Sequence, residues 1–533
     1  MTPTFVIDHN PLTLADLRRF VFARERYSVI EISSPTRARI EKAHQSLQLL
    51  LEKRIPIYGV TTGFGHSCFR VLKPEQSAEL QRNLVDYLSC GTGPIVPEEA
   101  SRATLLIRLK SLSLGFSGVS QALLDRMALC LERGWTPVVP REGSLGASGD
   151  LIPLAYLAQI IQGQGMVHSA QGPVPIAPLL KAAKIAPYEL KPKEGLALVN
   201  GTSTMAGLAM LNLLHARFLL ELQTTGTAWL CQIVRGKTEA FGPLVNELAK
   251  QHPGQARIAR RIRRVLEQET YLARRGQDVV IQESSQTDEQ IQDRYSLRCT
   301  PQILGPVLET LEQAEKWLET EINGASDNPL IGDGGELEMG GNFYGGYLAQ
   351  GMDYLKISLA HMADHLDRQL MLLFDERTSH GLPPNLANWP GLPEESRFLH
   401  HGLKGLHQAV NAITSEILPK SIPNGIFSRS SESHNQDKVS LGMSAAVQCS
   451  DLLEQSYTIQ AMSLICLAQA LDLRGIKPQG AAEKKLYETI RQVIAFVERD
   501  QPLGEPVRQL TQVLKTWAPH HEGSEELTTG GLR

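Results

Sequence analysis

The segment Gly143 to Ala155, which reads GSLGASGDLIPLA, contains the residues of this chain that point most clearly to chemistry. A serine among glycines, here Ser148, first suggests the nucleophile elbow of a hydrolase, whose pattern is G-x-S-x-G. That pattern needs glycine at position 150, where the chain has Asp150, so the hydrolase interpretation fails. The alternative without chemistry is a glycine-rich loop that precedes a helix, which is what a single short motif of this kind more often is.

The complete segment resembles the signature of the aromatic amino acid lyase family, which includes histidine, phenylalanine and tyrosine ammonia-lyases and related aminomutases. In that family an Ala-Ser-Gly tripeptide, here Ala147-Ser148-Gly149, cyclises without an added cofactor to 3,5-dihydro-5-methylidene-4H-imidazol-4-one (MIO). The residue types suit this reaction. Glycine leaves its nitrogen unhindered in a turn, serine has a β-hydroxyl whose elimination gives the methylidene, and alanine keeps the ring uncrowded.

The resemblance extends to a loop with the sequence YGVTTGFG, which begins at Tyr58. The tyrosine of the matching family loop is the catalytic base. Because an ordinary tyrosine titrates near pH ~10, Tyr58 needs either a positive environment that lowers its pKa or a proton acceptor behind it, and both alternatives stay open. Taken alone, Tyr58 would more often be a packed loop aromatic.

Two further segments resemble family motifs that contact the substrate or MIO. The sequence KEGLALVNGT contains Asn200, which by resemblance contacts MIO or the substrate. The sequence QDRYSLR contains Tyr295, which by resemblance lies on a second lid loop and helps form and polarise MIO, and Arg298, which would bind the substrate carboxylate. A planar guanidinium suits that role because it donates two parallel hydrogen bonds to a carboxylate.

Shorter matches at 327–329 (DNP), 341–343 (GNF) and 431–437 (SESHNQD) complete the resemblance. As isolated polar clusters they would more often be helix caps or satisfied core groups, and only the other motifs make them a site. The implied catalytic residues are Tyr58, Ala147, Ser148, Gly149 and Tyr295. The implied substrate-binding residues are Gly65, Tyr87, Leu88, Asn200, Arg298, Asn328, Phe343, Glu432, Asn435 and Gln436.

Three positions bear on the substrate ring. Histidine-type relatives have Ser-His where this chain has Tyr87-Leu88, and Glu where it has Gln436, and both departures oppose histidine. Phenylalanine-type relatives have Phe-Leu at the first place and bacterial tyrosine-type relatives have His-Leu. The Tyr87 hydroxyl needs a partner beside bound phenylalanine but can pair with the phenol of tyrosine. Tyr87 is longer than the histidine of the tyrosine-type relatives and could crowd the para-hydroxyl of the substrate. We expect the hydrogen bond to outweigh this steric effect.

The resemblance therefore predicts ammonia elimination from L-tyrosine to give 4-coumarate, and also from L-phenylalanine to give trans-cinnamate. The alternative is a tyrosine or phenylalanine 2,3-aminomutase, which has the same machinery but adds ammonia back at the β-carbon. Less favoured are a histidine ammonia-lyase and an inactive helical scaffold. Retention of every implied catalytic residue argues against the scaffold.

Helical periodicity dominates the elements that must position these residues, and alternation typical of strands is scarce. Helices are predicted at 40–53, 100–114, 119–133, 205–223, 302–323, 354–377 and 445–474. Several are apolar on nearly every face and must be surrounded by others in a bundle core or subunit interface. The predicted fold is mostly α, with a long central helix bundle and an N-terminal domain that bears MIO. By resemblance it forms an intertwined homotetramer.

The predicted domain ranges are 1–199, with the inner lid loop and the tripeptide, and 200–515, with the bundle and the second lid loop. A disordered tail is predicted at 516–533, which is polar and rich in glycine. The ranges 57–73 and 275–297 break the helical pattern, and long loops of this kind are usually functional or mobile.

Composition limits the partners. The 533 residues include 53 Lys and Arg against 57 Asp and Glu, a balance that does not resemble the basic footprint of a nucleic-acid binder. The polar residues within 195–222 oppose a membrane span. The N-terminus lacks the pattern of a secretory signal, and seven scattered cysteines are typical of reduced thiols, so we expect a cytoplasmic protein. The expected partners are a small aromatic amino acid and further copies of the chain.

A metal site is not expected. His361 and His365 are four residues apart on one helical face, but the pair lacks the glutamate of HExxH and an obvious third ligand.

Overall fold

The computed structural model describes residues 4–22, 29–269, 271, 275, 291–332, 334–524 and 527. The chain divides into two compact units. Unit 1 comprises Met1–Asn212, Ala314–Asp353 and Pro423–Ser450, and unit 2 comprises Leu213–Gln313, Tyr354–Ile422 and Asp451–Arg533. Each unit therefore combines three separate stretches of chain, whereas the sequence-based division used contiguous ranges.

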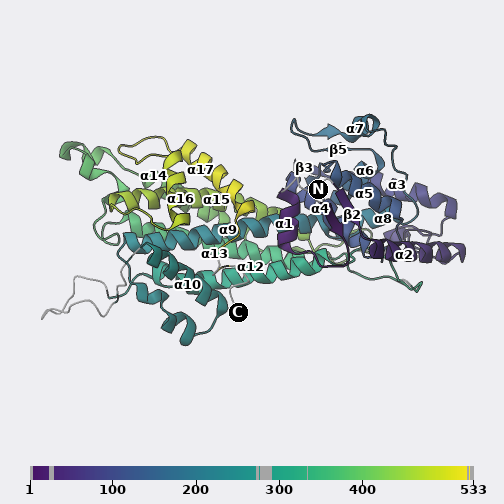
Figure 1. Cartoon of the computed structure of the whole chain (residues 1–533), viewed down its shortest axis with the longest axis horizontal. Coiled ribbons are helices and arrows are strands. Elements are labelled where there is room, and N and C mark those ends of the chain that lie inside the picture. The colour runs from purple at the N-terminus through teal and green to yellow at the C-terminus, as the bar shows by residue number, and fades with distance from the viewer. Residues whose placement is uncertain are drawn as a thin grey trace. The chain divides into compact units, whose positions relative to one another are not determined.

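Unit 1 contains helices of moderate length and four small sheets, each of two strands (Figure 1). Its helices are α1 (Leu14–Phe22), α2 (Ser34–Glu52), α3 (Ser77–Leu88), α4 (Glu98–Ser113), α5 (Gln121–Glu132), α6 (Leu151–Gln162), α7 (Ile176–Ala182) and α8 (Glu194–Val199). Short 3-10 turns are η2 (Gly65–Ser67), η3 (Pro74–Gln76) and η10 (Gly425–Phe427). Helices α3, α6 and α8 pack on one another, which brings together the segments that contain the candidate site.

The sheets of unit 1 are too short to form a layer. Strands β1 (Thr4–Ile7) and β2 (Val29–Ile32) are parallel. The other pairs are antiparallel: β3 (Thr92–Ile95) with β4 (Pro140–Glu142), β5 (Met166–Val167) with β6 (Val174–Pro175), and β7 (Leu330–Ile331) with β8 (Leu337–Glu338). The pair β3–β4 matters for function because β4 leads directly into the Ala-Ser-Gly segment.

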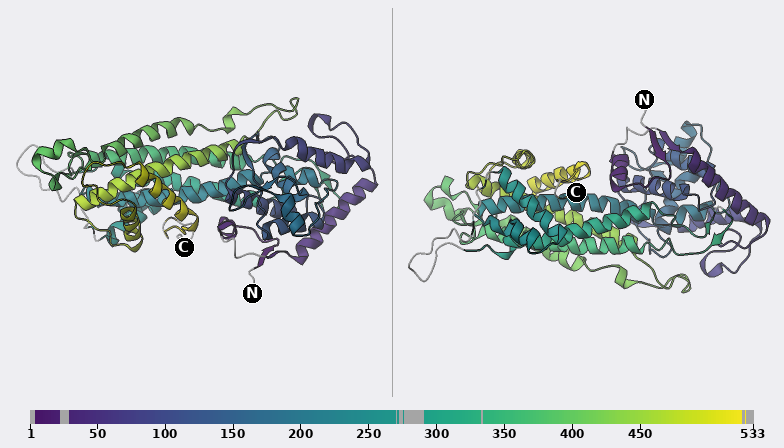
Figure 2. Two further views of the ribbon diagram at one scale, coloured as in Figure 1. Left: turned by 90° about the horizontal axis from the view of Figure 1, so that it is seen from above. Right: turned by 60° about the horizontal axis from the view of Figure 1, so that its bottom comes forward.

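Unit 2 is built from helices, and in the described part of the chain every named strand belongs to unit 1. The long helices α9 (Ser203–Ile233), α12 (Thr300–Ile322), α13 (Gly346–Phe374) and α15 (Gly442–Leu473) have their larger part in unit 2 and one end in unit 1, and they run side by side (Figures 1 and 2). The shorter helices are α10 (Pro253–Gln268), α11 (Tyr295–Arg298), α14 (Lys404–Lys420), α16 (Ala481–Val493) and α17 (Gly504–Trp517). Single turns are η4 (Thr238–Phe241), η5 (Leu244–Leu248), η7 (Pro384–Leu386), η8 (Trp389–Gly391), η9 (Glu394–Leu399) and η11 (Ala518–His520).

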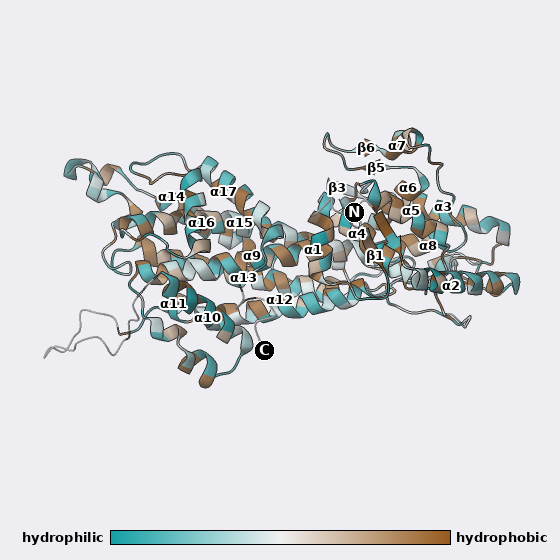
Figure 3. Ribbon diagram, in the orientation of Figure 1, coloured by the Kyte–Doolittle hydropathy of each residue, from teal (hydrophilic) through white to brown (hydrophobic). Residues whose placement is uncertain are grey.

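The sequence prediction of a mostly α fold is confirmed. The seven predicted helices correspond to α2, α4, α5, α9, α12, α13 and α15, with ends that differ by up to ten residues, as at the end of α9. Helix α10, which was not among the predicted helices, combines hydrophilic and hydrophobic residues (Figure 3), and its apolar Ile258, Ile262 and Val265 are buried. Burial of one apolar face stabilises a helix that is marginal in isolation.

Helix α9 is apolar along most of its length. By length and composition it could cross a membrane, but 89% of its most apolar window is buried inside the structure, as in a core helix. It therefore gives only weak support for a membrane span, and burial among other helices accounts for its composition.

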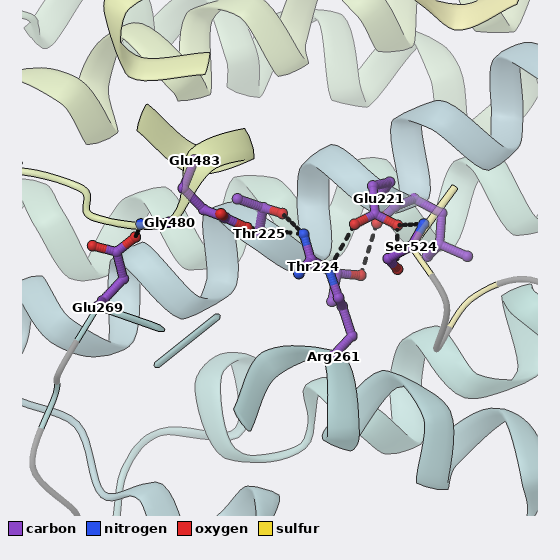
Figure 4. Close-up of polar contacts among 9 residues, drawn as sticks. Glu221, Thr224, Thr225, Arg261, Glu269, Gly480, Glu483 and Ser524 are labelled. Atoms are coloured by element: carbon purple, nitrogen blue, oxygen red, sulfur yellow. Dashed lines mark hydrogen bonds and ion pairs between the residues drawn. The ribbon is translucent and has the colours of Figure 1, made fainter. Parts of the chain in front are cut away.

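A buried ion network stabilises unit 2 (Figure 4). Arg261 of α10 donates to Glu221 of α9 at 2.6 Å and to Glu483 of α16 at 2.9 Å. Glu221 also accepts a hydrogen bond from the Ser524 hydroxyl at 2.8 Å. Glu269, just after α10, accepts hydrogen bonds from the backbone N–H groups of Gln479 and Gly480. A buried guanidinium between two carboxylates meets the requirement that buried charges are paired.

The structure also bears on the expected state of the cysteines and on the predicted disordered tail. All seven cysteines are free thiols, as expected. The range predicted as a disordered tail begins within α17 and continues as η11, where Ala518 and Pro519 are buried, so residues 516–520 are helical. Residues 525, 526 and 528–533 of that range, and residues 276–290 of the second predicted loop, lie outside the described part of the chain.

Candidate active site

The tripeptide Ala147-Ser148-Gly149 lies between β4 and α6 in unit 1. Gly149 has φ +72°, in the left-handed region that favours glycine. A Cβ atom added to Gly149 would collide with the carbonyl oxygen of Gly201. Only glycine therefore fits at the third position of the tripeptide, for a reason independent of the reaction that its nitrogen would perform.

Two amide side chains contact Ser148. Asn200, at the end of α8, donates from Nδ2 to the Ser148 carbonyl oxygen at 3.0 Å. Gln436 donates from Nε2 to the Ser148 Oγ at 3.3 Å. Two residues predicted from separate motifs thus meet at the central residue of the tripeptide.

Asp150 fixes the other end of the tripeptide. Its backbone N–H donates to the Gly201 oxygen at 2.7 Å, and its Oδ2 accepts from the Met205 N–H at 2.7 Å. Burial raises the pKa of this carboxyl to about 7. The sequence reasoning used Asp150 only to exclude a hydrolase. Its place directly after the tripeptide was the available signal for a positioning role.

Tyr58 lies at the start of the inner loop. The Gly65 N–H donates to the Tyr58 hydroxyl oxygen at 2.8 Å. The loop is tied to α8 by Gln81, a fully buried residue of α3 that donates to the Gly59 oxygen and accepts from the Leu196 N–H, both at 2.8 Å. Sequence reasoning missed Gln81, because nothing local distinguishes it from other polar residues of an amphipathic helix.

The environment of Tyr58 in unit 1 favours the neutral phenol. Burial raises the pKa of Tyr58, the Gly65 hydrogen bond lowers it, and the charges of Cys68 and Glu432 raise it again, with a net upward shift. Among the described residues of unit 1, neither of the two predicted means of activation, a nearby cation or a proton acceptor, dominates at Tyr58. A cation or a proton acceptor from outside this set is needed if Tyr58 acts as a base at neutral pH.

Glu432 joins the two halves of the site. Both of its carboxylate oxygens accept from the His66 N–H at 2.9 Å, and a Cβ added to Gly65 would collide with this carboxylate. Glu432, Ser433 and His434 have φ values of +52°, +52° and +65°. Three successive non-glycine residues in the left-handed region are strained.

The hydrogen bonds between Ser431 and Gln436 close this strained turn. Hydrogen bonds thus link Tyr58 to Gly65, the next residue His66 to Glu432, and Gln436, at the end of the turn that contains Glu432, to Ser148.

Tyr87 and Leu88 end helix α3. Leu88 is buried, at 7% exposure, whereas the Tyr87 side chain is 59% exposed as a whole. Desolvation of the Tyr87 hydroxyl, followed by the charges of Tyr58 and Glu432, raises its pKa to about 12. Tyr87 thus lies near Tyr58 and Glu432, and its hydroxyl remains a donor at neutral pH.

Three other predicted residues of unit 1 lie in loops. Asn328 accepts from the Gly340 N–H at 2.8 Å, and the Asn435 N–H donates to the Glu432 oxygen at 3.0 Å. Phe343 is half-buried just before α13. In the described part of the chain, these side chains make no hydrogen bond to the tripeptide, so they are not placed there by polar contacts.

Tyr295 and Arg298 belong to unit 2, where α11 contains both. The Arg298 guanidinium carbon lies 4.6 Å from the centre of the Tyr295 ring, and Tyr295 is 70% exposed. Arg298 lines a cavity of about 760 Å³ within unit 2, together with Lys237, Arg263 and Gln292. The helix thus presents an aromatic ring and a guanidinium at an accessible surface.

Buried polar side chains hold α11 in place. The Ser296 carbonyl oxygen accepts from His365 Nε2 at 2.8 Å and from Gln369 Nε2 at 2.9 Å. Gln223 donates to His365 Nδ1 at 2.9 Å, and burial lowers the pKa of His365 to about 4. His365 is therefore a neutral imidazole that positions α11, whereas His361 is exposed.

Comparison with known proteins identifies the family. The model of the aromatic amino acid lyase family matches residues 12–492. The chain belongs to the aromatic amino acid lyase family. It is 36% identical to tyrosine 2,3-aminomutase of Myxococcus fulvus, over 91% of this chain and 93% of the relative. It is 34% identical to histidine ammonia-lyase of Bacillus subtilis (strain 168), over 97% and 98%.

A solved aromatic amino acid lyase family structure has the same fold. Tyrosine aminomutase from Streptomyces globisporus superimposes with a TM-score of 0.90 at 32% identity, covering 97% of this chain and 98% of that one. The resemblance expected from the motifs is thereby confirmed, as is an enzyme of the ammonia-lyase and aminomutase class. Relatives named as ammonia-lyases and as aminomutases both align over more than nine-tenths of this chain.

Proposed function

We propose that this protein eliminates ammonia from L-tyrosine to give 4-coumarate, and from L-phenylalanine to give trans-cinnamate. The observation that supports the proposal most is the set of contacts from Tyr58 through Glu432 and Gln436 to Ser148. It joins the expected base to the residue whose side chain would become the electrophile. Tyr87 and Leu88 lie on a helix that packs against this region.

The prosthetic group of this proposal is MIO, formed from Ala147, Ser148 and Gly149. The cradle at Gly149 and the Asn200 hydrogen bond to the Ser148 carbonyl fit a compact ring at this position. When present, MIO supplies an electrophilic methylidene that makes the substrate amine a better leaving group. Asn200 would polarise the carbonyl that is conjugated with this methylidene.

The side chains of the protein then have distinct roles. The Tyr58 phenolate accepts the β-proton of the substrate and becomes a neutral phenol, and the Gly65 N–H stabilises the phenolate form by donating to its oxygen. Arg298 binds the substrate carboxylate through two parallel hydrogen bonds.

The ring pocket supports tyrosine over histidine. Leu88 is buried and apolar, so it packs against a phenyl ring but offers no hydrogen bond to an imidazole. Gln436 is neutral where histidine-type relatives have glutamate. The raised pKa of Tyr87 keeps its hydroxyl protonated, so it can donate to the phenol oxygen of bound tyrosine.

A tyrosine 2,3-aminomutase is the second candidate, because two named tyrosine 2,3-aminomutases are 36% and 33% identical to this chain. Both activities begin with the same elimination, and they differ in whether ammonia is added back at the β-carbon. The purified protein should be incubated separately with L-tyrosine, L-phenylalanine and L-histidine, and the products identified by mass and ultraviolet absorbance. Accumulating 4-coumarate supports the lyase, β-tyrosine supports the mutase, and turnover of histidine alone contradicts both.

We also propose that the active enzyme is a homotetramer whose sites use residues of more than one subunit. Large apolar side chains at least 68% exposed in this chain need cover, and examples are Leu244, Leu248, Phe398, Leu399 and Ile426. The positive group that Tyr58 requires would also come from outside its own neighbourhood. Light scattering of the purified protein tests this, and a fully active monomer at micromolar concentration would contradict it.

Arg298→Lys is expected to reduce kcat/KM strongly, because one ammonium cannot reproduce a two-pronged contact with a carboxylate. The loss of one charge-assisted contact corresponds to about 1.5 to 3 kcal/mol, or roughly 10- to 100-fold. Arg294→Lys is the matched control, since Arg294 is exposed and directly precedes α11. Steady-state kinetics with L-tyrosine measure both. Equal kinetics for the two variants would place the carboxylate site elsewhere.

Tyr87→Phe is expected to lower kcat/KM for L-tyrosine relative to L-phenylalanine. The variant removes the hydroxyl that pairs with the substrate phenol, and a lost hydrogen bond of this kind corresponds to about 1 to 3 kcal/mol. The ratio of the two specificity constants measures the effect, with L-phenylalanine as the internal reference. A gain in tyrosine activity would mean that Tyr87 crowds the para-hydroxyl instead of binding it.

A further inference from the structure

A fully buried arginine lies behind the tripeptide. Arg108 of α4 has no exposed surface, and its Nη1 donates to the Ser326 hydroxyl at 3.1 Å. Within the described residues, its Nε and Nη2 have no hydrogen-bond partner. Burial of an incompletely bonded guanidinium is costly.

The guanidinium packs directly against the backbone of Gly201. A Cβ atom added to Gly201 would collide with Arg108 Nη1 and would also be too close to the Ser326 hydroxyl. The absence of a side chain at Gly201 is therefore what allows Arg108 to reach this backbone.

Gly201 in turn packs against the tripeptide. Its carbonyl oxygen accepts from the Asp150 N–H at 2.7 Å and occupies the space where a Gly149 side chain would be. The preceding Asn200 donates to the Ser148 carbonyl. Residues 200–201 therefore contact the Arg108 guanidinium through Gly201 and the tripeptide through both residues.

Buried charges keep Arg108 in this position. Asp327 and Asp150 both attract it and partly offset the effect of burial, which lowers the pKa of Arg108 to about 10, so it remains charged at neutral pH. Asp327 is itself fixed by Lys193 at 2.5 Å and by the Ser117 hydroxyl at 2.9 Å. The Arg108 guanidinium, which packs against Gly201, is thus held among charged groups that are themselves paired.

We propose that Arg108 is a positioning residue for closure of the MIO ring: it presses residues 200–201 against Ala147-Ser148-Gly149 so that the Gly149 nitrogen meets the Ala147 carbonyl carbon. The inference rests on the proposed function in assuming that this ring forms. Ring closure needs near-attack geometry, and a displacement of about 1 Å can cost 100-fold in rate.

The reaction needs no reagent beyond the chain. The Gly149 nitrogen forms a bond to the Ala147 carbonyl carbon, and its proton goes to the former carbonyl oxygen. That oxygen leaves as water with the Ser148 amide proton, which produces a carbon–nitrogen double bond. The Ser148 hydroxyl leaves as a second water with the α-proton and produces the methylidene. Two waters are lost and no oxidant is required.

The test compares two arginines on one helix. Arg102 of α4 is also buried, at 4% exposure, but packs over the Phe20 ring at 4.8 Å. Intact mass of freshly folded Arg108→Met and Arg102→Met reports the loss of two waters, and circular dichroism reports folding. We expect Arg102→Met to mature like the wild type and Arg108→Met to lose water about 100-fold more slowly. Complete maturation of folded Arg108→Met at the wild-type rate would overturn the proposal.

Milder variants decide the matter if Arg108→Met does not fold. Arg108→Lys keeps a charge and one donor near Ser326, and Ser326→Ala removes only the partner of Nη1. Slower water loss in both folded variants supports the positioning role, and wild-type rates in both would overturn it. If the wild type itself retains both waters, the proposed function fails. If the wild type and Arg108→Met mature equally, only the role of Arg108 fails.

Discussion

Ser148→Ala is expected to give a folded chain that keeps the mass of its unmodified sequence and has no measurable turnover. Alanine lacks the β-hydroxyl whose elimination creates the methylidene, so the electrophile cannot form. The side chain is small and half-buried, and among the described residues its Oγ has a hydrogen bond only with Gln436, at 3.3 Å, so the fold should be unaffected. Intact mass, circular dichroism and product formation from L-tyrosine are the three measurements.

Ser144→Ala is the matched control for this variant. Ser144 lies in the same loop, and its hydroxyl donates to Asp150 at 3.3 Å, but Ser144 contributes no atom to MIO. We expect this control to lose two waters and to keep most of its activity. Substantial turnover by Ser148→Ala would mean that the chemistry does not depend on MIO at this tripeptide.

Tyr58→Phe is expected to lose about 10²- to 10⁴-fold in kcat/KM, the range typical of removing a general base. Its intact mass should still show the loss of two waters, because the Tyr58 hydroxyl contacts Gly65 and not the tripeptide. This combination separates Tyr58→Phe from Ser148→Ala, in which mass and activity change together. Activity within tenfold of the wild type would assign the base elsewhere.

The pH dependence has a defined sign. A base works in its deprotonated form, and burial in unit 1 raises the pKa of Tyr58, so the phenolate fraction increases toward alkaline pH. The Tyr58 contribution to kcat/KM should therefore rise with pH and be missing from Tyr58→Phe. A wild-type rate that falls with increasing pH through the neutral range would contradict a tyrosine base.

The long helices could be predicted from the sequence because their apolar residues recur with the helical period, as in α12 and α13. The tripeptide and its nearest partners could also be found, because Asn200 and Gln436 lie in motifs that can be recognised from residue types alone. The relation between these motifs could not be predicted. Glu432 and His66 are 366 residues apart, and no local pattern reports that a carboxylate caps that loop.

The residues that support the site could not be predicted from the sequence for a related reason. Gln81 and Arg108 look like ordinary helix residues, and their importance lies in partners far along the chain, Leu196 and Ser326. The discontinuous units have the same origin, because contacts between distant stretches define them. Burial of a charged side chain is a property of the folded packing and leaves no mark on its neighbours in sequence.

Because Gly149 fits closely against Gly201 only in the folded chain, the mass of the protein can report whether the chain has ever folded. The Asn200–Ser148 hydrogen bond beside that fit joins residues 52 positions apart, so the cradle exists only after distant parts of unit 1 have met. Under the proposed ring closure, a chain that has folded once contains the MIO ring. Because the ring is covalent, it remains after the chain is denatured. A chain that never folded keeps both waters. The intact mass of a denatured sample would then distinguish chains that have folded before from chains that have not.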